Sequence, residues 1–117
     1  MTVRDVAQEL GLTICCGEEG LNRQVTGGYA GDLLSDVIAN SMAGNLWITM
    51  QVHVNIVAVA VLKELSAIIL VNGRSPSEET LQRAREEKVA ILSATDQAYK
   101  VAGRLYAFGV GAPCSDG

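Results

Sequence analysis

The sequence predicts a layered α/β domain in which helices flank a mainly parallel sheet. Three observations favour this fold class. The chain has 117 residues, which is enough for one domain with one core. Its hydrophobic fraction is 49% but its aromatic fraction is only 4%, so the core must consist of aliphatic side chains. Short apolar stretches alternate with helical patterns, as in domains built from parallel strands and crossover helices.

The chain divides into eleven expected segments without an internal linker or repeat. In order, these are helix 2–10, strand 12–16, turn 17–20, strand 24–29 running into a glycine-dense turn over 27–32, helix 32–40, strand 46–50, helix 53–65, strand 67–72, helix 76–88, strand 90–93 and a last helix that runs to residue 108. We expect residues 1–110 to form one domain and residues 111–117 to form a flexible tail.

The first helix has clear signals at both ends. Thr2 and Asp5 have the spacing of a capping box, and Gly11 is suited to the left-handed conformation that ends a helix. The helix over 76–88 is similarly marked by Ser75, Pro76 and an acidic residue in its first turn. Its many charged residues are typical of a solvated face. Thr95 or Asp96 is expected to cap the last helix.

The stretch 53–65 is ambiguous, because its alternating Val and Ala residues also suit a strand. The flanking stretches 46–50 and 67–71 are better strands, and two parallel strands need a crossover between them. We therefore expect a helix here. It would be apolar almost all round, which predicts burial on more than one side, and a homodimer contact is a natural explanation.

Composition excludes several classes of function. The net charge is −4 and the isoelectric point is near 4.8, with no basic run, which argues against nucleic-acid binding. The apolar run 54–62 is too short to cross a bilayer, and no signal peptide is visible, so we expect a cytoplasmic protein that does not engage a membrane. The three cysteines form no disulfide framework and suit a reducing compartment. With a single histidine, they also do not complete a familiar zinc-binding pattern.

The candidate binding site lies where the strands end. In open α/β sheets, ligands bind beyond the carboxyl ends of strands, where helix N-termini favour anions. Loops 27–32, 49–55, 72–75 and 93–96 meet this description. These loops, together with the residue just before the first of them, supply the candidate ligand-binding residues. They are Thr26, Gly27, Gly28, Tyr29, Asp32, Thr49, His53, Asn55, Asn72 and Arg74.

Each of these residues also has a purely structural interpretation. The glycines lack the spacing of a nucleotide-binding fingerprint, and a tight turn would need the same residues. His53 suits helix capping better than proton transfer, although Tyr29 could stack on a planar ligand. No nucleophile stands beside a base in the sequence. We predict no catalytic residue, metal or cofactor.

Several motifs together resemble the DRTGG domain family over about residues 1–110. They are Val25-Thr26-Gly27-Gly28-Tyr29-Ala30-Gly31-Asp32-Leu33-Leu34-Ser35-Asp36-Val37, Trp47-Ile48-Thr49, His53-Val54-Asn55-Ile56-Val57-Ala58-Val59-Ala60 and Ile69-Leu70-Val71-Asn72-Gly73. The family's eponymous motif is spread out here, with Asn22 in place of its acid and two residues between Arg23 and Thr26. The resemblance implies a fold like that of the amino-terminal domain of HPr kinase/phosphorylase. It also implies a relation to the DRTGG region of phosphate acetyltransferases and a regulatory, non-catalytic role.

Three functional hypotheses follow from the sequence. The first is a homodimeric regulatory domain that senses an anionic metabolite or a nucleotide. The second is a protein–protein interaction module that docks on a partner through the apolar helix over 53–65. The third, a minority interpretation, is a small enzyme that uses His53 with Asp32.

Overall fold

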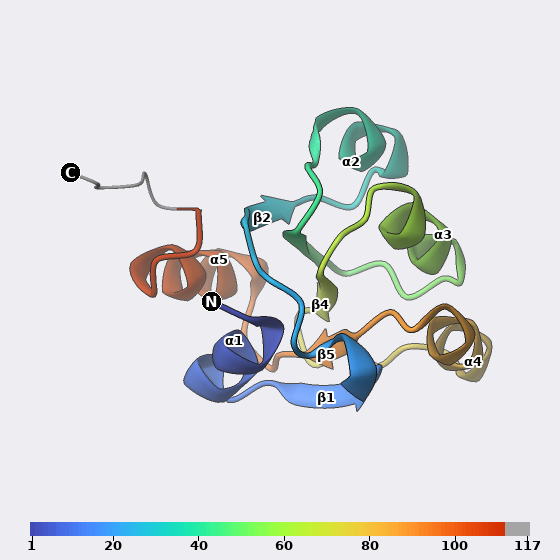
Figure 1. The fold of residues 1–117 in the computed structure, drawn as a ribbon, viewed down its shortest axis with the longest axis horizontal. Coiled ribbons are helices and arrows are strands. Elements are labelled where there is room, and N and C mark those ends of the chain that lie inside the picture. Colours follow the sequence, from blue (N-terminus) through green and yellow to red (C-terminus); the bar gives the residue numbers. More distant parts are fainter. Residues whose placement is uncertain (112–117) are drawn as a thin grey trace.

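The computed structural model describes residues 1–111 and contains a five-stranded sheet between two layers of helices (Figure 1). This confirms the predicted fold class. The elements are α1 (Val3–Leu10), β1 (Thr13–Cys16), the 3-10 helix η1 (Glu18–Gly20), β2 (Gly27–Ala30), α2 (Leu34–Asn40), β3 (Asn45–Thr49), α3 (Asn55–Leu62), β4 (Ala67–Leu70), α4 (Glu78–Glu87), β5 (Ile91–Ser93) and α5 (Ala98–Ala107). Residues 112–117, most of the expected tail, lie outside the described part of the chain.

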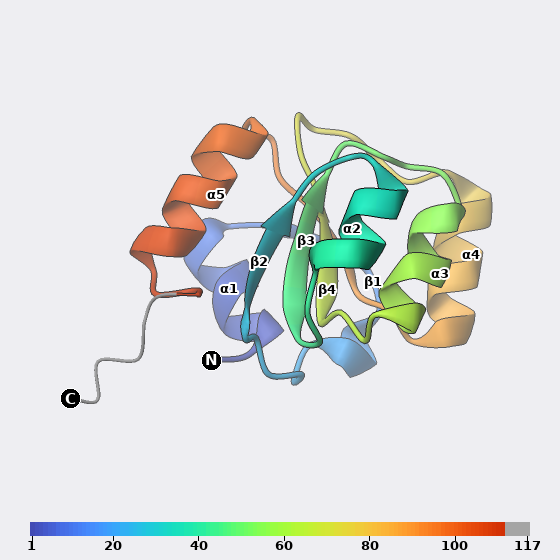
Figure 2. The ribbon, with the colours of Figure 1, turned by 90° about the horizontal axis from the view of Figure 1, so that it is seen from above.

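The sheet has the strand order β1-β5-β4-β3-β2. Strands β2 to β5 are parallel and adjacent in chain order, whereas β1 pairs antiparallel with β5. The crossover helices α2, α3 and α4 cover one face, and α1 and α5 cover the other (Figures 1 and 2). The carboxyl ends of four parallel strands therefore meet at one edge of the sheet, and β2 is a terminal strand.

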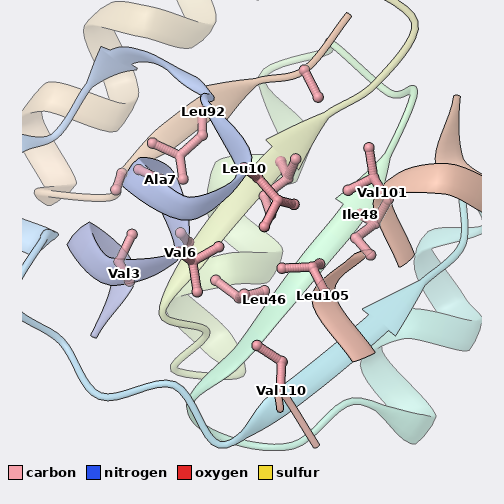
Figure 3. Close-up of a cluster of buried hydrophobic side chains, with 14 of the residues drawn as sticks. Val3, Val6, Ala7, Leu10, Leu46, Ile48, Leu92, Val101, Leu105 and Val110 are labelled. Atoms are coloured by element: carbon pink, nitrogen blue, oxygen red, sulfur yellow. The ribbon is translucent and has the colours of Figure 1, made fainter. Parts of the chain in front are cut away.

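Alternate residues of the strands supply two cores. Leu46 and Ile48 of β3 face α1 and α5, where aliphatic side chains of both helices converge on the sheet (Figure 3). Trp47, between them, faces α2 and α3 and is completely buried. A strand that is buried on both faces reads as a continuous apolar run, which is why the central strands could be located from sequence.

The capping box at the start of α1 is confirmed. The Thr2 hydroxyl accepts from the Asp5 backbone N–H at 3.3 Å, and the Asp5 carboxylate accepts from the Thr2 N–H at 2.9 Å. Gly11 ends the helix with a φ of +66°. The hydrogen bond from the Thr2 backbone N–H, and next the contact with the Thr2 side chain, hold the pKa of the Asp5 carboxylate below its usual value.

The glycine-dense turn expected over 27–32 is wrong for its first four residues, which form β2. They pair in parallel with residues 45–48 of β3, so the chain turns only after Ala30. The absence of a Cβ at Gly27 serves close packing rather than a turn. A Cβ there would lie 3.2 Å from the Asn45 side-chain nitrogen and 3.9 Å from the Cα of Gly111.

Helices α2, α4 and α5 begin later than the sequence predicts. α2 begins at Leu34 instead of residue 32, because the Asp32 carboxylate bonds to β3 and its loop rather than to α2. α4 begins at Glu78, where Ser77 caps the Thr80 N–H at 3.2 Å, so Pro76 precedes the helix. α5 begins at Ala98, with Gln97 in place of Thr95 or Asp96 as the residue before it.

Helix α3 is shorter than the expected 53–65 and is not buried all round. It ends at Leu62, just before Glu64 adopts a φ of +54°. Four of its residues face the core, but Ala58, Val61 and Leu62 face outward. None of the helices within residues 1–111 has the length and apolarity needed to cross a bilayer.

Candidate functional site

The ends of β2 and β3 are joined by the side chain of Asp32. One oxygen of its carboxylate, Oδ1, accepts from the Thr49 hydroxyl at 2.7 Å and from the Met50 backbone N–H at 2.8 Å. We call the group Asp32, Thr49, Met50, Gln51 and Asn72 the carboxyl corner, since these residues lie at or just beyond the carboxyl ends of β2, β3 and β4. Within residues 1–111, no hydrogen bond engages the second oxygen of Asp32, and the residue is exposed. This second oxygen can accept a hydrogen bond from a ligand.

The loop around Asp32 is held by its neighbours. The side-chain nitrogen of Gln51 donates to the Asp32 carbonyl at 3.1 Å, and the Gln51 backbone N–H donates to the Thr49 hydroxyl at 3.1 Å. The buried indole of Trp47 donates to the Gly31 carbonyl at 2.8 Å. The carboxylate of Asp32 is thereby fixed at the edge of the sheet before any ligand arrives.

Asn72 brings the end of β4 to the same corner. It adopts a φ of +60°, its N–H donates to the Asp96 carbonyl at 2.9 Å, and its side-chain amide contacts the Met50 sulfur at 3.0 Å. Arg74 follows two residues later with an exposed side chain, while its carbonyl accepts from the Ser93 hydroxyl at 3.0 Å. The carboxyl corner thus holds the Asp32 carboxylate, and the Arg74 guanidinium belongs to the neighbouring loop after β4.

His53 and Asn55 form the entrance to α3. The Nδ1 atom of His53 accepts from the Asn55 backbone N–H at 3.1 Å, which is a capping interaction. Within residues 1–111, the Asp32 carboxylate accepts from Thr49 and Met50, and no hydrogen bond joins it to His53. The preceding carbonyl, that of Val52, is fixed to α4 by the Thr80 hydroxyl at 2.8 Å.

Thr26 and Gly27 lie at the opposite, amino end of β2. The Thr26 hydroxyl donates to the Ala43 carbonyl at 2.8 Å and accepts from the Asn45 side chain at 3.3 Å. This bond ties the start of β2 to the start of β3. The structure therefore does not bring these two residues together with Asp32.

Tyr29 points to the face of the sheet covered by α2. Its hydroxyl donates to the Asp36 carboxylate, which also accepts from the Asn40 side chain at 2.8 Å. The hydrogen bond to the carboxylate stabilises the protonated phenol and raises the pKa of Tyr29 above its usual value. This hydrogen bond holds the Tyr29 side chain against α2. Stacking of its ring on a planar ligand stays a prediction.

A second feature was missed by sequence reasoning. A hollow of about 220 Å³ lies between the α5 face of β2 and α5 itself. Small residues create it, and Gly28 alone among the candidate residues lines it. The lining residues are Gly28, Ala30, Ile48, Ala102, Leu105, Tyr106, Val110 and Gly111. The sequence signal for this hollow is that Ala102 and Tyr106 are four residues apart and therefore lie on the same side of the last helix.

The model of the DRTGG domain family matches residues 5–108, most of the chain. The chain belongs to the DRTGG domain family. Among solved structures, this DRTGG chain is similar to the CBS and DRTGG domains of the regulatory region of Clostridium perfringens pyrophosphatase, complexed with its activator, diadenosine tetraphosphate. The TM-score is 0.68 with 10% identity over 95% of this chain, which shows a shared fold.

The chain spans 48% of the length of that pyrophosphatase regulatory region. No curated protein matches the sequence. The family assignment therefore rests on the domain model, and the structural likeness supports the fold.

Proposed function

We propose that this DRTGG domain is a non-catalytic regulatory domain of the cytoplasm that binds a nucleotide at its carboxyl corner. The observation that carries the proposal is the fixed Asp32 carboxylate, which keeps one oxygen available beside a loop with Thr49 and Gln51. The pyrophosphatase region named above binds a nucleotide activator, which supports the same ligand class. The two described thiols, Cys15 and Cys16, are free, which suits a reducing compartment.

The charges of the corner favour a nucleotide over a simple anion. A carboxylate accepts hydrogen bonds and repels phosphate, so Asp32 suits the hydroxyl groups of a ribose. Arg74 follows β4 and bonds to Ser93 of β5, so it lies two to three strands from β2, roughly 10–15 Å away at the usual strand spacing. A ligand that has hydroxyls at one end and phosphates at the other fits this separation of charge.

Ligand binding can be tested by thermal unfolding with AMP, ATP and inorganic phosphate, using the wild type and the variants Asp32→Asn and Arg74→Ala. A ligand at 100 times its dissociation constant stabilises the folded state by about 2.7 kcal/mol. We expect stabilisation by the nucleotides, weakened in both variants. Arg83→Ala is the matched control, because Arg83 is an exposed arginine on α4 that pairs with Glu87. If no nucleotide or anion changes the unfolding temperature, the proposal is wrong.

A second candidate function is supported by the outer face of α3. Leu62 is 65% exposed and Val61 is 45% exposed on a helix that has no charged residue. We propose that this face docks an apolar surface of a partner protein, and that the chain itself forms a homodimer. Leu62→Glu should abolish partner binding without lowering the unfolding temperature, because the side chain is already in water. A large loss of stability would instead identify Leu62 as core.

A further inference from the structure

The two adjacent cysteines of β1 direct their side chains to the same face of the sheet. Successive side chains of a regular strand point to opposite faces. In β1, Ile14 pairs with Leu92 of β5. Cys16 pairs with the adjacent residue of β5, Ile91, so that Cys15 is an extra residue in the ladder. This β-bulge breaks the alternation of side chains. Cys16 belongs to the core that includes α3 and α4, and Cys15 packs against the same core.

The partners in β5 agree with this placement. Leu92 belongs to the core that includes α1 and α5, whereas Ile91 belongs to the core that includes α3 and α4. Residues directly opposite each other on paired strands share a face, so Ile14 faces the α1 side and Cys16 faces the α4 side. In a regular strand, the residue two positions after Ile14 would share its face. The bulge instead turns Cys16 toward α4, to the side on which Cys15 already lies.

The two thiols differ in exposure. Cys15 is half-buried, whereas Cys16 is buried and its thiol donates to the Val89 carbonyl at 3.7 Å. Burial raises the pKa of both thiols, so both hold their protons at neutral pH. A contact with the Ile91 backbone, and next the positive charge of Arg85 in α4, favour the thiolate form of Cys16. A ligand can therefore reach the pair from the side of Cys15 and find a second sulfur beneath it.

The donor atoms of this pair select the class of ligand. Thiolate sulfur is a soft donor, and soft ions such as Cu(I) prefer it. In the part of the chain that the structure describes, no group of three or more histidine, cysteine, aspartate or glutamate side chains is placed to hold a metal ion. An ion at Cys15 and Cys16 would therefore have two ligands from these residues, both of them sulfur. Cu(I) is satisfied by two thiolates in a near-linear arrangement, whereas zinc needs about four ligands.

We propose that Cys15 and Cys16 form a dithiol site that binds one Cu(I) ion between their sulfur atoms. Each thiol loses its proton when its sulfur coordinates the ion, so two protons are released and the bound group carries one net negative charge. The site is separate from the carboxyl corner, because β1 and β2 are terminal strands at opposite ends of the sheet (Figure 1). It does not depend on the proposed nucleotide binding. The pair could not be recognised from sequence, because two adjacent residues of a regular strand would face opposite layers.

The test is an anaerobic titration of the reduced chain with Cu(I), in competition with the coloured Cu(I) chelator bicinchoninate. We expect the wild type to take one Cu(I) per chain from the chelator. Cys15→Ser and Cys16→Ser each remove one of the two sulfur ligands. Each should weaken binding by more than the roughly 10- to 100-fold that the loss of an outer-shell partner costs. Cys114→Ser is the matched control, because it removes the third cysteine of the chain and should leave binding unchanged. Circular dichroism establishes that each variant is folded.

The outcomes separate the pair from a single reactive thiol. Binding that survives Cys15→Ser or Cys16→Ser overturns the proposal, and so does binding that is lost in Cys114→Ser or absent from the wild type. If Cys16→Ser does not fold, phenylarsine oxide decides the question. This reagent forms two As–S bonds with a pair of neighbouring thiols and releases water, and intact-mass spectrometry detects the adduct. An adduct on the wild type and Cys114→Ser that is absent from Cys15→Ser supports the pair. An adduct that persists in Cys15→Ser, or none on the wild type, refutes it.

Discussion

The Asp32 carboxylate accepts a hydrogen bond from the Thr49 hydroxyl, with 2.7 Å between the two oxygens, across the ends of two neighbouring strands. Thr49 is 2% exposed, whereas Asp32 is exposed, so the bond links a buried position to the surface. The same carboxylate oxygen accepts from the Met50 N–H. One side chain therefore closes the turn after β2 and shapes the start of the loop after β3.

Removing the Asp32 carboxylate should destabilise the domain. We expect Asp32→Ala to lower the free energy of unfolding by about 1–3 kcal/mol, because the Thr49 hydroxyl and the Met50 N–H lose a charged acceptor. Asp32→Asn retains an acceptor oxygen and should lose less. Urea denaturation measures both values. Equal losses in the two variants would show that the acceptor oxygen is not what stabilises the corner.

Two glycines with positive φ should respond differently to alanine. Gly11 (φ +66°) has no atom within 4 Å of an added Cβ, whereas a Cβ on Gly17 (φ +87°) would lie 2.5 Å from the Ala90 Cα. Gly11→Ala should cost about 1–2 kcal/mol for the left-handed conformation alone. Gly17→Ala should cost about 1–3 kcal/mol more, because the backbone just before β5 must shift. Chemical denaturation of both variants gives the difference, and similar losses would contradict the close approach of Gly17 to the Ala90 backbone.

The capping box should contribute measurably to stability. Thr2→Ala should lower the free energy of unfolding by about 0.5–2 kcal/mol, and Thr2→Ser should restore most of it. The lowered pKa of Asp5 determines how the stability contributed by the capping box changes with pH. A depressed pKa adds stability above the unfolded-state value that disappears as the pH falls through the folded-state value. The difference between wild type and Asp5→Asn should therefore shrink in acid; a constant difference would argue against the box.

Tyr29 should ionise at a higher pH than a free tyrosine. Its bond to Asp36 raises its pKa, so the stabilisation is present below the ordinary pKa of tyrosine and is lost as the pH rises through the raised value. Ultraviolet titration of tyrosinate should show one late-ionising group in the wild type. That group should move to lower pH in Asp36→Asn and remain in Tyr99→Phe, since Tyr99 is 88% exposed. A late group that persists in Asp36→Asn would exclude this assignment.

The layers of the fold were predictable from sequence because the central strands are apolar on both faces. The burial of Trp47 and of the residues of β4 could be predicted because these side chains are apolar. The start of β2 was harder to place, since glycine disfavours a strand and the pairing that overrides this comes from Asn45–Ile48, distant in sequence. The start of α2 was misplaced because Asp32 bonds across the sheet to Thr49 instead of capping the helix.

The candidate site was predictable only in part, for a similar reason. Position at the carboxyl ends of strands correctly groups Asp32, Thr49 and Asn72, because parallel strands end at one edge. Sequence proximity wrongly grouped Thr26 with Asp32, because β2 runs between them and separates them by its length. Tyr29 and Gly28 are neighbours in the chain but face opposite layers. The hollow beside α5 depends on Gly28 and Ala102, which only tertiary structure brings together.

The antiparallel pair of β1 with β5 joins the first strand of the chain to the last described one, with Thr13 opposite Ser93. During synthesis, β1 leaves the ribosome long before its partner exists, while β2, β3 and β4 can pair in the order in which they appear. The apolar side of α1 can already pack on β3 and β4, but β1 has no strand to pair with until β5 has been made. Truncation before β5 would therefore leave the backbone of β1 unpaired while α1 keeps part of its core contacts.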